Sequence, residues 1–367
     1  MKAGAPSEAS PGGLAGREVR AHEARVSDTA PTSALPTRPR VFVTARLPEP
    51  IEARLGGLFD TTINRHGHPL GREELCMAVR GTQVLVPTVT DRIDGAFIDA
   101  CGDDLRLIAN FGAGTNHIDV AHAHARGIMV TNTPDVLTED TADLAMAMIL
   151  ALPRRLVEGD RLVRSGRFEG WTPTSTLGHR VRGMDLGIVG LGRIGQAVAR
   201  RAHAFGLRVH YHNRRRVAEP VEAELGATYH DDLLAMLAAV DIVSINSPLT
   251  EQTRHLIGED ALQALGPDGY IVNTARGGVI DEAALARALE AGTVAGAGLD
   301  VYEDEPEVHP RLLTLPNVIL APHIGSATHQ SRTEMGEKVI INIRAVIDGH
   351  NPPDRVLPPG STFRKVS

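Results

Sequence analysis

Residues 186–201 have the sequence LGIVGLGRIGQAVARR, in which an apolar run ends at a glycine and a helical pattern begins a few residues later. The spacing of Gly190, Gly192 and Gly195 gives each glycine a physical task. The first makes a tight turn, the second admits a pyrophosphate close to the backbone, and the third lets the helix pack on the strand. Free N–H groups at the helix start then face the phosphates. The stretch predicts a dinucleotide site, although a tight strand-to-helix turn or a site for another nucleoside-type ligand would use similar glycines.

The composition is typical of a globular protein with two domains, since 367 residues include 42% hydrophobic and 23% charged residues. No run approaches the ~18–20 apolar residues of a membrane span, so we expect no membrane partner. The net charge of −7 disfavours a nucleic-acid partner. The only cysteines, Cys76 and Cys101, have neither metal-ligand nor CxxC spacing. We therefore expect no metal site, no disulfide framework and a reducing compartment such as the cytoplasm.

Apolar runs of strand length alternate with helical stretches from residue 39 onward, which predicts parallel sheets covered on both faces. Strands are expected at 41–43, 84–86, 107–109 and 128–130, and then at 186–189, 207–211, 241–245, 270–273, 296–299 and 318–320. Helices are expected at 75–79, 96–100, 141–152, 282–290 and 334–348. The predicted fold class is α/β with two doubly wound, Rossmann-like sheets.

Both ends of the chain are predicted to be tails. Residues 1–38 are rich in Ala, Pro, Gly, Ser and Thr and lack apolar periodicity, which is typical of disorder. The Pro-rich sequence from Pro352 predicts that regular structure stops there and that residues 353–367 form a C-terminal tail. Residues 161–177 are expected to form a loop that contains the single tryptophan, Trp171.

The second strand after the glycine loop indicates which dinucleotide is preferred. An NAD site usually has an Asp or Glu about 20 residues past the glycines, where it accepts a hydrogen bond from the ribose 2′-OH. Here the strand end continues with Asn213, Arg214, Arg215 and Arg216 and has no carboxylate. Guanidinium groups bind a 2′-phosphate through paired hydrogen bonds. The pattern favours NADP over NAD, although the arginines could also form a solvated edge.

Three stretches that follow predicted strands contain the groups that reduction of a 2-keto acid needs. Arg276 suits the substrate carboxylate, and His323 suits the proton donor because imidazole titrates near neutral pH. Several carboxylates lie within 300–306, and one of them beside the histidine would favour its protonated form. All three stretches lie at carboxyl ends of strands, where open α/β sheets bind ligands. The glycine-containing stretch 110–116 also follows a predicted strand, and it is either a further ligand site or only a turn.

Four ordered motifs carry a resemblance to a known family: the glycine loop, NTARGGVIDE at 273–282, GLDVYEDEP at 298–306 and PHIGS at 322–326. Together they resemble the D-isomer-specific 2-hydroxyacid dehydrogenases, and within that family most resemble the glyoxylate/hydroxypyruvate reductases. The resemblance covers roughly residues 40–352. It implies reduction of glyoxylate or hydroxypyruvate to a D-2-hydroxy acid with NADPH or NADH. It also implies a dinucleotide-binding domain, 138–325, inserted into a substrate domain formed by 39–137 and 326–352.

The resemblance also implies roles for individual residues. Arg276 would bind the substrate carboxylate together with the backbone of Ala113 and Gly114, and His323, partnered by Glu305, would be the acid/base. Trp171 would reach the pocket of a neighbouring subunit, which implies a homodimer. The cofactor would contact Arg193 and Ile194 at the pyrophosphate, Asn213 and Arg214 at the ribose, Ser247, Pro248 and Thr253 at the adenosine, and Thr274 and Asp300 near the nicotinamide.

Two alternatives stay open. A homologue could reduce a bulkier 2-keto acid, such as 2-ketogluconate or a phenylpyruvate, since the sequence does not give the width of the pocket. Some relatives are transcriptional corepressors that use the same fold as a dinucleotide sensor and bind partner peptides. Formate dehydrogenase activity is disfavoured because those relatives lack a glutamate at the position of Glu305.

Overall fold

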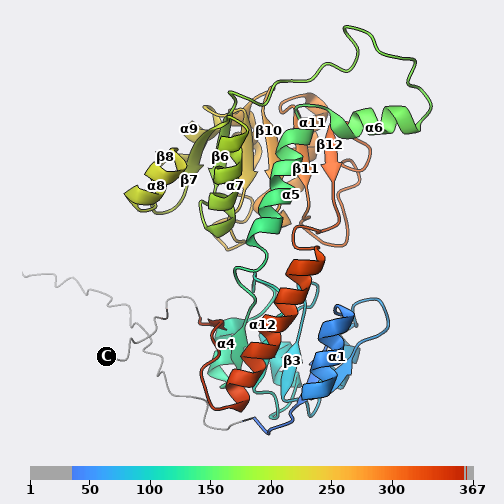
Figure 1. The fold of residues 1–367 in the computed structure, drawn as a ribbon, viewed down its shortest axis with the longest axis vertical. Coiled ribbons are helices and arrows are strands. Elements are labelled where there is room, and N and C mark those ends of the chain that lie inside the picture. Colours follow the sequence, from blue (N-terminus) through green and yellow to red (C-terminus); the bar gives the residue numbers. More distant parts are fainter. Residues whose placement is uncertain (1–34, 359–360, 362–367) are drawn as a thin grey trace, which may run out of the picture.

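The computed structural model describes residues 35–358 and residue 361, which form two lobes, each built on one β-sheet (Figure 1). The six-stranded sheet and its helices make up the first lobe. Its strands, in the spatial order β13-β5-β4-β3-β1-β2, are β1 Arg40–Val43, β2 Asp60–Ile63, β3 Val84–Val86, β4 Leu107–Ala109, β5 Met129–Thr131 and β13 Arg355–Val356. Its helices are α1 Glu49–Leu58, α2 Arg72–Val79, α3 Gly95–Ala100, α4 Val120–Ala125 and α12 His329–Ile347.

The second lobe contains a seven-stranded sheet in which all neighbouring strands are parallel. In the order β12-β11-β10-β9-β6-β7-β8, its strands are β6 Asp185–Val189, β7 Arg208–His212, β8 Ala227–His230, β9 Ile242–Ile245, β10 Tyr270–Asn273, β11 Gly296–Leu299 and β12 Val318–Leu320. Its helices are α5 Thr138–Ala151, α6 Leu156–Arg164, α7 Arg193–Ala204, α8 Glu219–Leu225, α9 Leu233–Leu237, α10 Glu259–Leu265, the 3₁₀ helix η1 Gly277–Val279 and α11 Glu282–Ala291.

Each sheet is buried on both faces because successive side chains of a strand point in opposite directions. In β1, Val41 and Val43 pack with α1 and α12, whereas Phe42 packs on the other face with α2, α3 and α4. In the second lobe, Leu186 and Ile188 pack with α5 and α7 on one face of the sheet, while α9, α10 and α11 cover the other. This burial explains why the strands form continuous apolar runs in the sequence.

The chain crosses between the lobes twice, before α5 and before α12, and the two crossings are joined to each other. Asp140 accepts hydrogen bonds from the side chains of Thr328 and Ser331. The same Ser331 hydroxyl lies 2.8 Å from the carbonyl oxygen of Val136, so that its one proton faces both acceptors. These contacts fix the start of α12 against the start of α5, and therefore set how the carboxyl edges of the two sheets face each other.

The α/β class with two parallel-sheet lobes is confirmed, and so are all ten predicted strands, within one or two residues at their ends. The sequence missed three edge strands, β2, β8 and β13, whose sequences DTTI, ATYH and RV are only partly buried. An edge strand does not need a continuous apolar run, so the signal used for the other strands is absent there.

Two predictions about irregular segments were wrong. Residues 353–367 are not entirely a tail, because β13 pairs antiparallel with β5 and adds a strand to the first sheet. Residues 161–177 are not entirely a loop, because α6 continues through Arg164. The predicted disordered segment 1–38 lies mostly outside the described residues, but Leu35 is buried in the first lobe. Within 35–358, no helix combines the length and the apolar character that crossing a membrane requires.

Candidate active site

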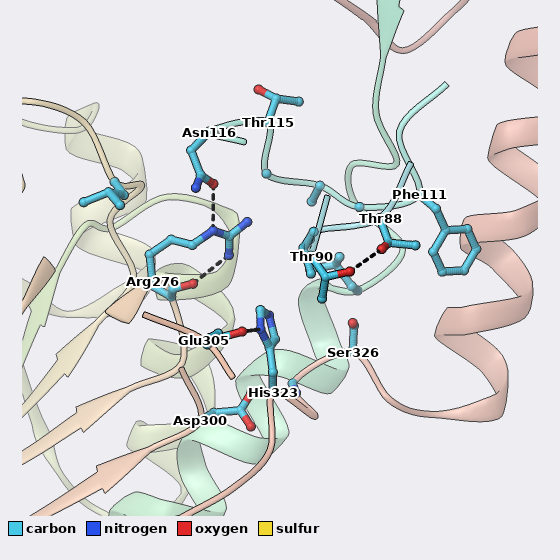
Figure 2. A pocket seen from close by; sticks show the side chains of 18 of the residues that line it. Thr88, Thr90, Phe111, Thr115, Asn116, Arg276, Asp300, Glu305, His323 and Ser326 are labelled. Carbon is cyan, nitrogen blue, oxygen red and sulfur yellow. Dashed lines mark hydrogen bonds and ion pairs between the residues drawn. The ribbon is translucent and has the colours of Figure 1, made fainter. Parts of the chain in front are cut away.

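A cleft of ≈ 1640 Å³ lies between the lobes and is lined by loops at the carboxyl ends of both sheets. Ligand pockets of small molecules usually measure ~300–1,000 Å³, so this cleft has room for a large ligand and a second, small one. Figure 2 shows the two walls: Arg276, Glu305 and His323 come from the second lobe, and the segment from Phe111 to Asn116 faces them from the first.

The glycine loop between β6 and α7 has the geometry that its spacing predicts. Gly190 has φ +96°, a conformation that side chains disfavour, and a Cβ there would lie 2.8 Å from the backbone nitrogen of Ser247. A Cβ on Gly195 would lie 2.3 Å from the carbonyl oxygen of Gly190, so α7 can pack this closely against the turn only because residue 195 is a glycine. Gly192 faces open space, and no side chain caps the start of α7. Phosphate oxygens could therefore reach the first amides of α7.

Two buried hydroxyl groups beside this loop lack a partner. The side-chain oxygens of Ser247, after β9, and of Thr274, after β10, make no hydrogen bond to any described residue. Buried polar atoms are rarely left unpaired in folded proteins. Both residues line the cleft together with Ile194 and Pro248, as predicted for a dinucleotide site. The donor set therefore fits a long polar ligand that lies along the carboxyl edge of the second sheet.

His323 and Glu305 form the central pair of the cleft. The Nδ1 atom of His323 lies 2.7 Å from Oε2 of Glu305, and each side chain is 28% exposed. The backbone N–H of Tyr302 donates to the other carboxylate oxygen of Glu305 at 3.1 Å. Burial raises the pKa of Glu305, but the hydrogen bond and positive charge of His323 outweigh it, so the pKa lies below its usual value. The carboxylate thus stays ionised beside the imidazole, whose Nε2 atom is left for a substrate.

The backbone at His323 is strained and is held by Asp300. His323 has φ +56°, in the left-handed region that side chains seldom adopt. The carboxylate of Asp300 accepts from the backbone N–H of Ile324 at 2.7 Å and of Gly325 at 2.8 Å. Burial raises the pKa of Asp300, and these two hydrogen bonds oppose the rise. The residue predicted to lie near the nicotinamide therefore also fixes the turn that carries the histidine.

Arg276 reaches across the cleft to the first lobe. Its Nε donates to Oδ1 of Asn116 at 2.8 Å, and its Nη1 donates to the carbonyl oxygen of Ala275 at 2.6 Å. A Cβ on Gly114 would lie 1.8 Å from Nη2 of Arg276, so only glycine permits this approach. Burial lowers the pKa of Arg276, partly offset by the charge of Glu305. The Arg276 guanidinium and the Ala113–Gly114 backbone therefore lie next to each other in the cleft. A substrate carboxylate would need such a cation and such N–H groups around it.

Several predicted cofactor residues have other partners in this structure. The Arg193 guanidinium pairs with Asp135 of the first lobe at 2.6 Å. The carboxamide oxygen of Asn213 accepts from the backbone N–H of Leu191 at 2.8 Å and so braces the glycine loop. Thr253 donates to the carbonyl oxygen of Pro248 at 2.6 Å. These contacts support the shape of the cofactor-binding edge, and the predicted contacts with a dinucleotide stay predictions.

The three consecutive arginines after β7 lie in different environments. Arg216 pairs with Glu222 at 2.7 Å and lies over the ring of Tyr229, 5.7 Å from its centroid. Arg214 and Arg215 are exposed, and neither has an ion-pair or hydrogen-bond partner among residues 35–358. Two of the three guanidinium groups are therefore available to an anion at the end of β7.

Trp171 does not line the cleft of its own chain. It lies 82% exposed in the segment after α6, which extends away from the second lobe (Figure 1). The predicted contact with a neighbouring subunit's pocket is not tested by one chain.

Several polar residues of the cleft were not singled out in the sequence. Asn116 holds Arg276, Thr88 and Thr90 contact each other through their hydroxyls at 3.0 Å, and Arg332 of α12 lines the same cavity. Asn116 belongs to the stretch 110–116, which the sequence marked as a ligand site or a turn, whereas nothing in the pattern marked the other three residues. No group of His, Cys, Asp and Glu within 35–358 is arranged to hold a metal ion.

A two-lobed α/β protein with a glycine-rich βα turn and an Arg, Glu and His across one cleft is typical of a nicotinamide-dependent oxidoreductase. Comparison with known proteins identifies the family. Residues 146–325 match the model of the D-isomer specific 2-hydroxyacid dehydrogenase NAD-binding domain. The chain is 44% identical over 323 residues to a glyoxylate reductase of Thermococcus litoralis, covering 87% of this chain and 97% of that one. A glyoxylate reductase of Korarchaeum cryptofilum is 44% identical over 333 residues, which cover 88% and 99% of the two chains.

A solved structure supports the same family. The NADPH-dependent glyoxylate/hydroxypyruvate reductase of Sinorhizobium meliloti, in complex with NADP and malonate, superimposes with a TM-score of 0.79 at 38% identity and covers 90% of this chain and 99% of its own. This protein belongs to the D-isomer specific 2-hydroxyacid dehydrogenase family. The cofactor is therefore a nicotinamide dinucleotide.

Proposed function

We propose that this protein reduces small 2-keto acids, with glyoxylate and hydroxypyruvate as substrates, to 2-hydroxy acids that have the D configuration where the product is chiral, and that it prefers NADPH to NADH. One observation carries the proposal. The cleft brings Arg276 and the His323–Glu305 pair from the second lobe to face the Ala113–Gly114 backbone of the first. This set matches a short acid with a carboxylate at one end and a carbonyl group beside it.

The residues divide the chemistry among them. Arg276 binds the substrate carboxylate by paired hydrogen bonds, and the amides of Ala113 and Gly114 complete its shell. The bound dinucleotide supplies a hydride to the keto carbon. Protonated His323 donates its Nε2 proton to the keto oxygen, and Glu305 on Nδ1 keeps the ring oriented and stabilises its positive charge. Ser247 and Thr274 give their unpaired hydroxyls to the dinucleotide.

The proposed NADPH preference rests on the end of β7. Arg214 and Arg215 are free to bind a 2′-phosphate, and no carboxylate follows the strand to repel it. The relative from Sinorhizobium meliloti is NADPH-dependent by name, which supports the same preference.

We also propose that the protein is a homodimer in the cytoplasm. The segment around α6 exposes five large apolar side chains, Leu156, Val163, Phe168, Trp171 and Leu177, and a partner copy would cover them. The two free cysteines fit a reducing compartment. Light scattering should give the mass of two chains, and Trp171→Ala should weaken the dimer or raise the KM for the acid. A monodisperse monomer would exclude the dimer.

Initial rates test the central proposal. Glyoxylate, hydroxypyruvate, pyruvate and 2-ketogluconate should be offered to the purified protein with NADPH and with NADH, and the nicotinamide absorbance followed. We expect the first two acids to react fastest and NADPH to be the better donor. Faster turnover of 2-ketogluconate would indicate a bulkier substrate. Tight cofactor binding without turnover of any acid would favour a dinucleotide sensor.

A further inference from the structure

The loop after β4 has every carbonyl group of residues 112–114 tied to a donor. The carboxamide nitrogen of Asn110 donates to the carbonyl oxygens of Gly112 and Gly114, both at 2.9 Å. The carboxamide nitrogen of Asn132, just after β5, donates to the carbonyl oxygen of Ala113 at 2.7 Å. The backbone N–H of Thr133 adds a second bond to Gly112, at 3.0 Å. Two asparagine side chains thus hold three successive carbonyl groups.

Fixing a carbonyl group also fixes the next N–H group. The peptide unit is planar and trans, so its C=O and N–H bonds point in opposite directions. The bond from Asn110 to Gly112 therefore orients the amide of Ala113, and the bond from Asn132 to Ala113 orients the amide of Gly114. Neither amide has an acceptor among the described residues. Both lie at the wall of the cleft that Arg276 approaches.

The side chain of Asn110 is itself held in one orientation. Carbonyl oxygens can only accept, so the carboxamide nitrogen must face them and the oxygen must face His117. That oxygen lies 3.0 Å from Nε2 of His117, which is therefore the donor. Burial, and next the positive charge of Arg276, lower the pKa of His117 to about 4. The support beneath the loop is consequently uncharged at neutral pH, and no carboxylate in it competes with a bound acid for Arg276.

We propose that Asn110 and Asn132 are positioning residues for the substrate carboxylate, because they aim the amides of Ala113 and Gly114 into the cleft. The inference rests on the proposed function, since it takes the bound acid to lie there. The amides contact the carboxylate equally before and during hydride transfer, so misaligning them weakens binding without slowing the chemical step. The expected signature is a raised KM with an unchanged kcat.

Asn132→Leu is the main test because this side chain is only half-buried, and leucine removes the donor while keeping the same branched arrangement of non-hydrogen atoms. The matched control is Asn317→Leu, because Asn317 is also half-buried and donates to a backbone carbonyl group, that of Ala295, at 3.0 Å, far from the cleft. With the full chain and NADP⁺ bound, Asn132→Leu should raise the Kd for oxalate and the KM for glyoxylate about tenfold. The kcat should stay within threefold, the KM for NADPH should be unchanged, and Asn317→Leu should leave all these values near wild type.

Other outcomes separate this inference from the proposed function. The inference would be overturned if Asn132→Leu bound oxalate with a Kd within twofold of the wild type. It would also be overturned if Asn317→Leu raised the oxalate Kd as much as Asn132→Leu does. In either case, glyoxylate turnover by the wild type would still uphold the proposed function. A wild type that binds oxalate but reduces no keto acid would overturn the function, and the oxalate Kd values of the variants would then decide the inference. A wild type that does not bind oxalate overturns the inference as well. Asn110→Asp, which replaces both donated bonds with a negative charge, should raise the oxalate Kd further than Asn132→Leu if the inference holds.

Discussion

The two walls of the cleft present charge in different ways. On the second lobe the polar groups are ionisable side chains: Arg276, Glu305 and His323. On the first lobe the groups that face Arg276 are uncharged: the backbone amides of Ala113 and Gly114, supported by asparagine side chains. We call this part of the lining the first-lobe wall, and it does not include Arg332 of α12. Proton transfer needs groups that change charge, whereas recognition of a fixed anion needs only dipoles held in place. Changes to the second-lobe wall should therefore alter kcat and its pH dependence, and changes to the first-lobe wall should alter KM.

The largest effect is expected for His323→Ala. Removing the proposed proton donor of the keto oxygen should lower kcat by at least ~10²-fold. The Kd for NADPH, measured by quenching or enhancement of nicotinamide fluorescence, should stay near wild type because the proposed dinucleotide contacts lie on other loops. A kcat within a few-fold of wild type would show that another group supplies the proton, and the proposed division of labour between the two walls would fail.

Glu305→Gln should have the next largest effect. Glutamine can still accept the hydrogen bond from Nδ1 of His323 but lacks the negative charge of the carboxylate. The hydrogen bond and the positive charge of His323 lower the pKa of Glu305 against the effect of burial, so the wild type presents an ionised carboxylate to the ring. We expect kcat for reduction to fall about tenfold at pH 7. A kcat within twofold of the wild type would mean that Glu305 only orients the ring.

The same contrast between the walls explains what the sequence could predict. Arg276 and His323 follow strands, and their side chains are chemically distinctive, so position and residue type together indicated them. Position also indicated a run of carboxylates at 300–306, from which the family resemblance selected Glu305. The first-lobe wall acts through backbone amides, which every residue has, and through asparagines such as Asn132, which are common in loops. The place of residues 110–116 after a strand indicated a ligand site or only a turn, the resemblance singled out Ala113 and Gly114, and the supporting roles of Asn110 and Asn132 were missed.

Partners that are distant in the sequence also limited the prediction. The three arginines after β7 are equivalent as a pattern, but only the fold shows that Arg216 is occupied by Glu222 while Arg214 and Arg215 are not. Asn213 was assigned to a ribose through the family resemblance, and only the fold shows that its carboxamide oxygen also accepts from the backbone N–H of Leu191. The strands themselves were predictable because burial on both faces requires continuous apolar runs.

Arg214→Ala extends the comparison to the cofactor edge of the second lobe. If this guanidinium binds the 2′-phosphate, the variant should lose about tenfold in kcat/KM for NADPH and little for NADH, since only NADPH carries that group. Arg216→Ala is the matched control, because its side chain is paired with Glu222, and it should lower the Tm without changing the ratio of the two cofactors. Equal weakening of NADPH and NADH by Arg214→Ala would contradict the contact.

The smallest effect concerns the uncharged support of the first-lobe wall. Because the pKa of His117 is lowered to about 4 in the folded protein, the unfolded chain, with a histidine pKa near 6.5, binds more protons between these values. Stability contributed by the neutral His117 is therefore complete above pH 6.5 and decreases as the pH falls toward 4. From pH 6.5 to 5.5 the loss should be about 1 kcal/mol, or roughly 2 °C in Tm. His117→Gln, which can still donate to Asn110 but cannot titrate, should lose about 2 °C less than the wild type over this interval. Equal shifts in the two proteins would show that His117 is not kept neutral by its burial, and the first-lobe wall would then be charged at acidic pH like the second.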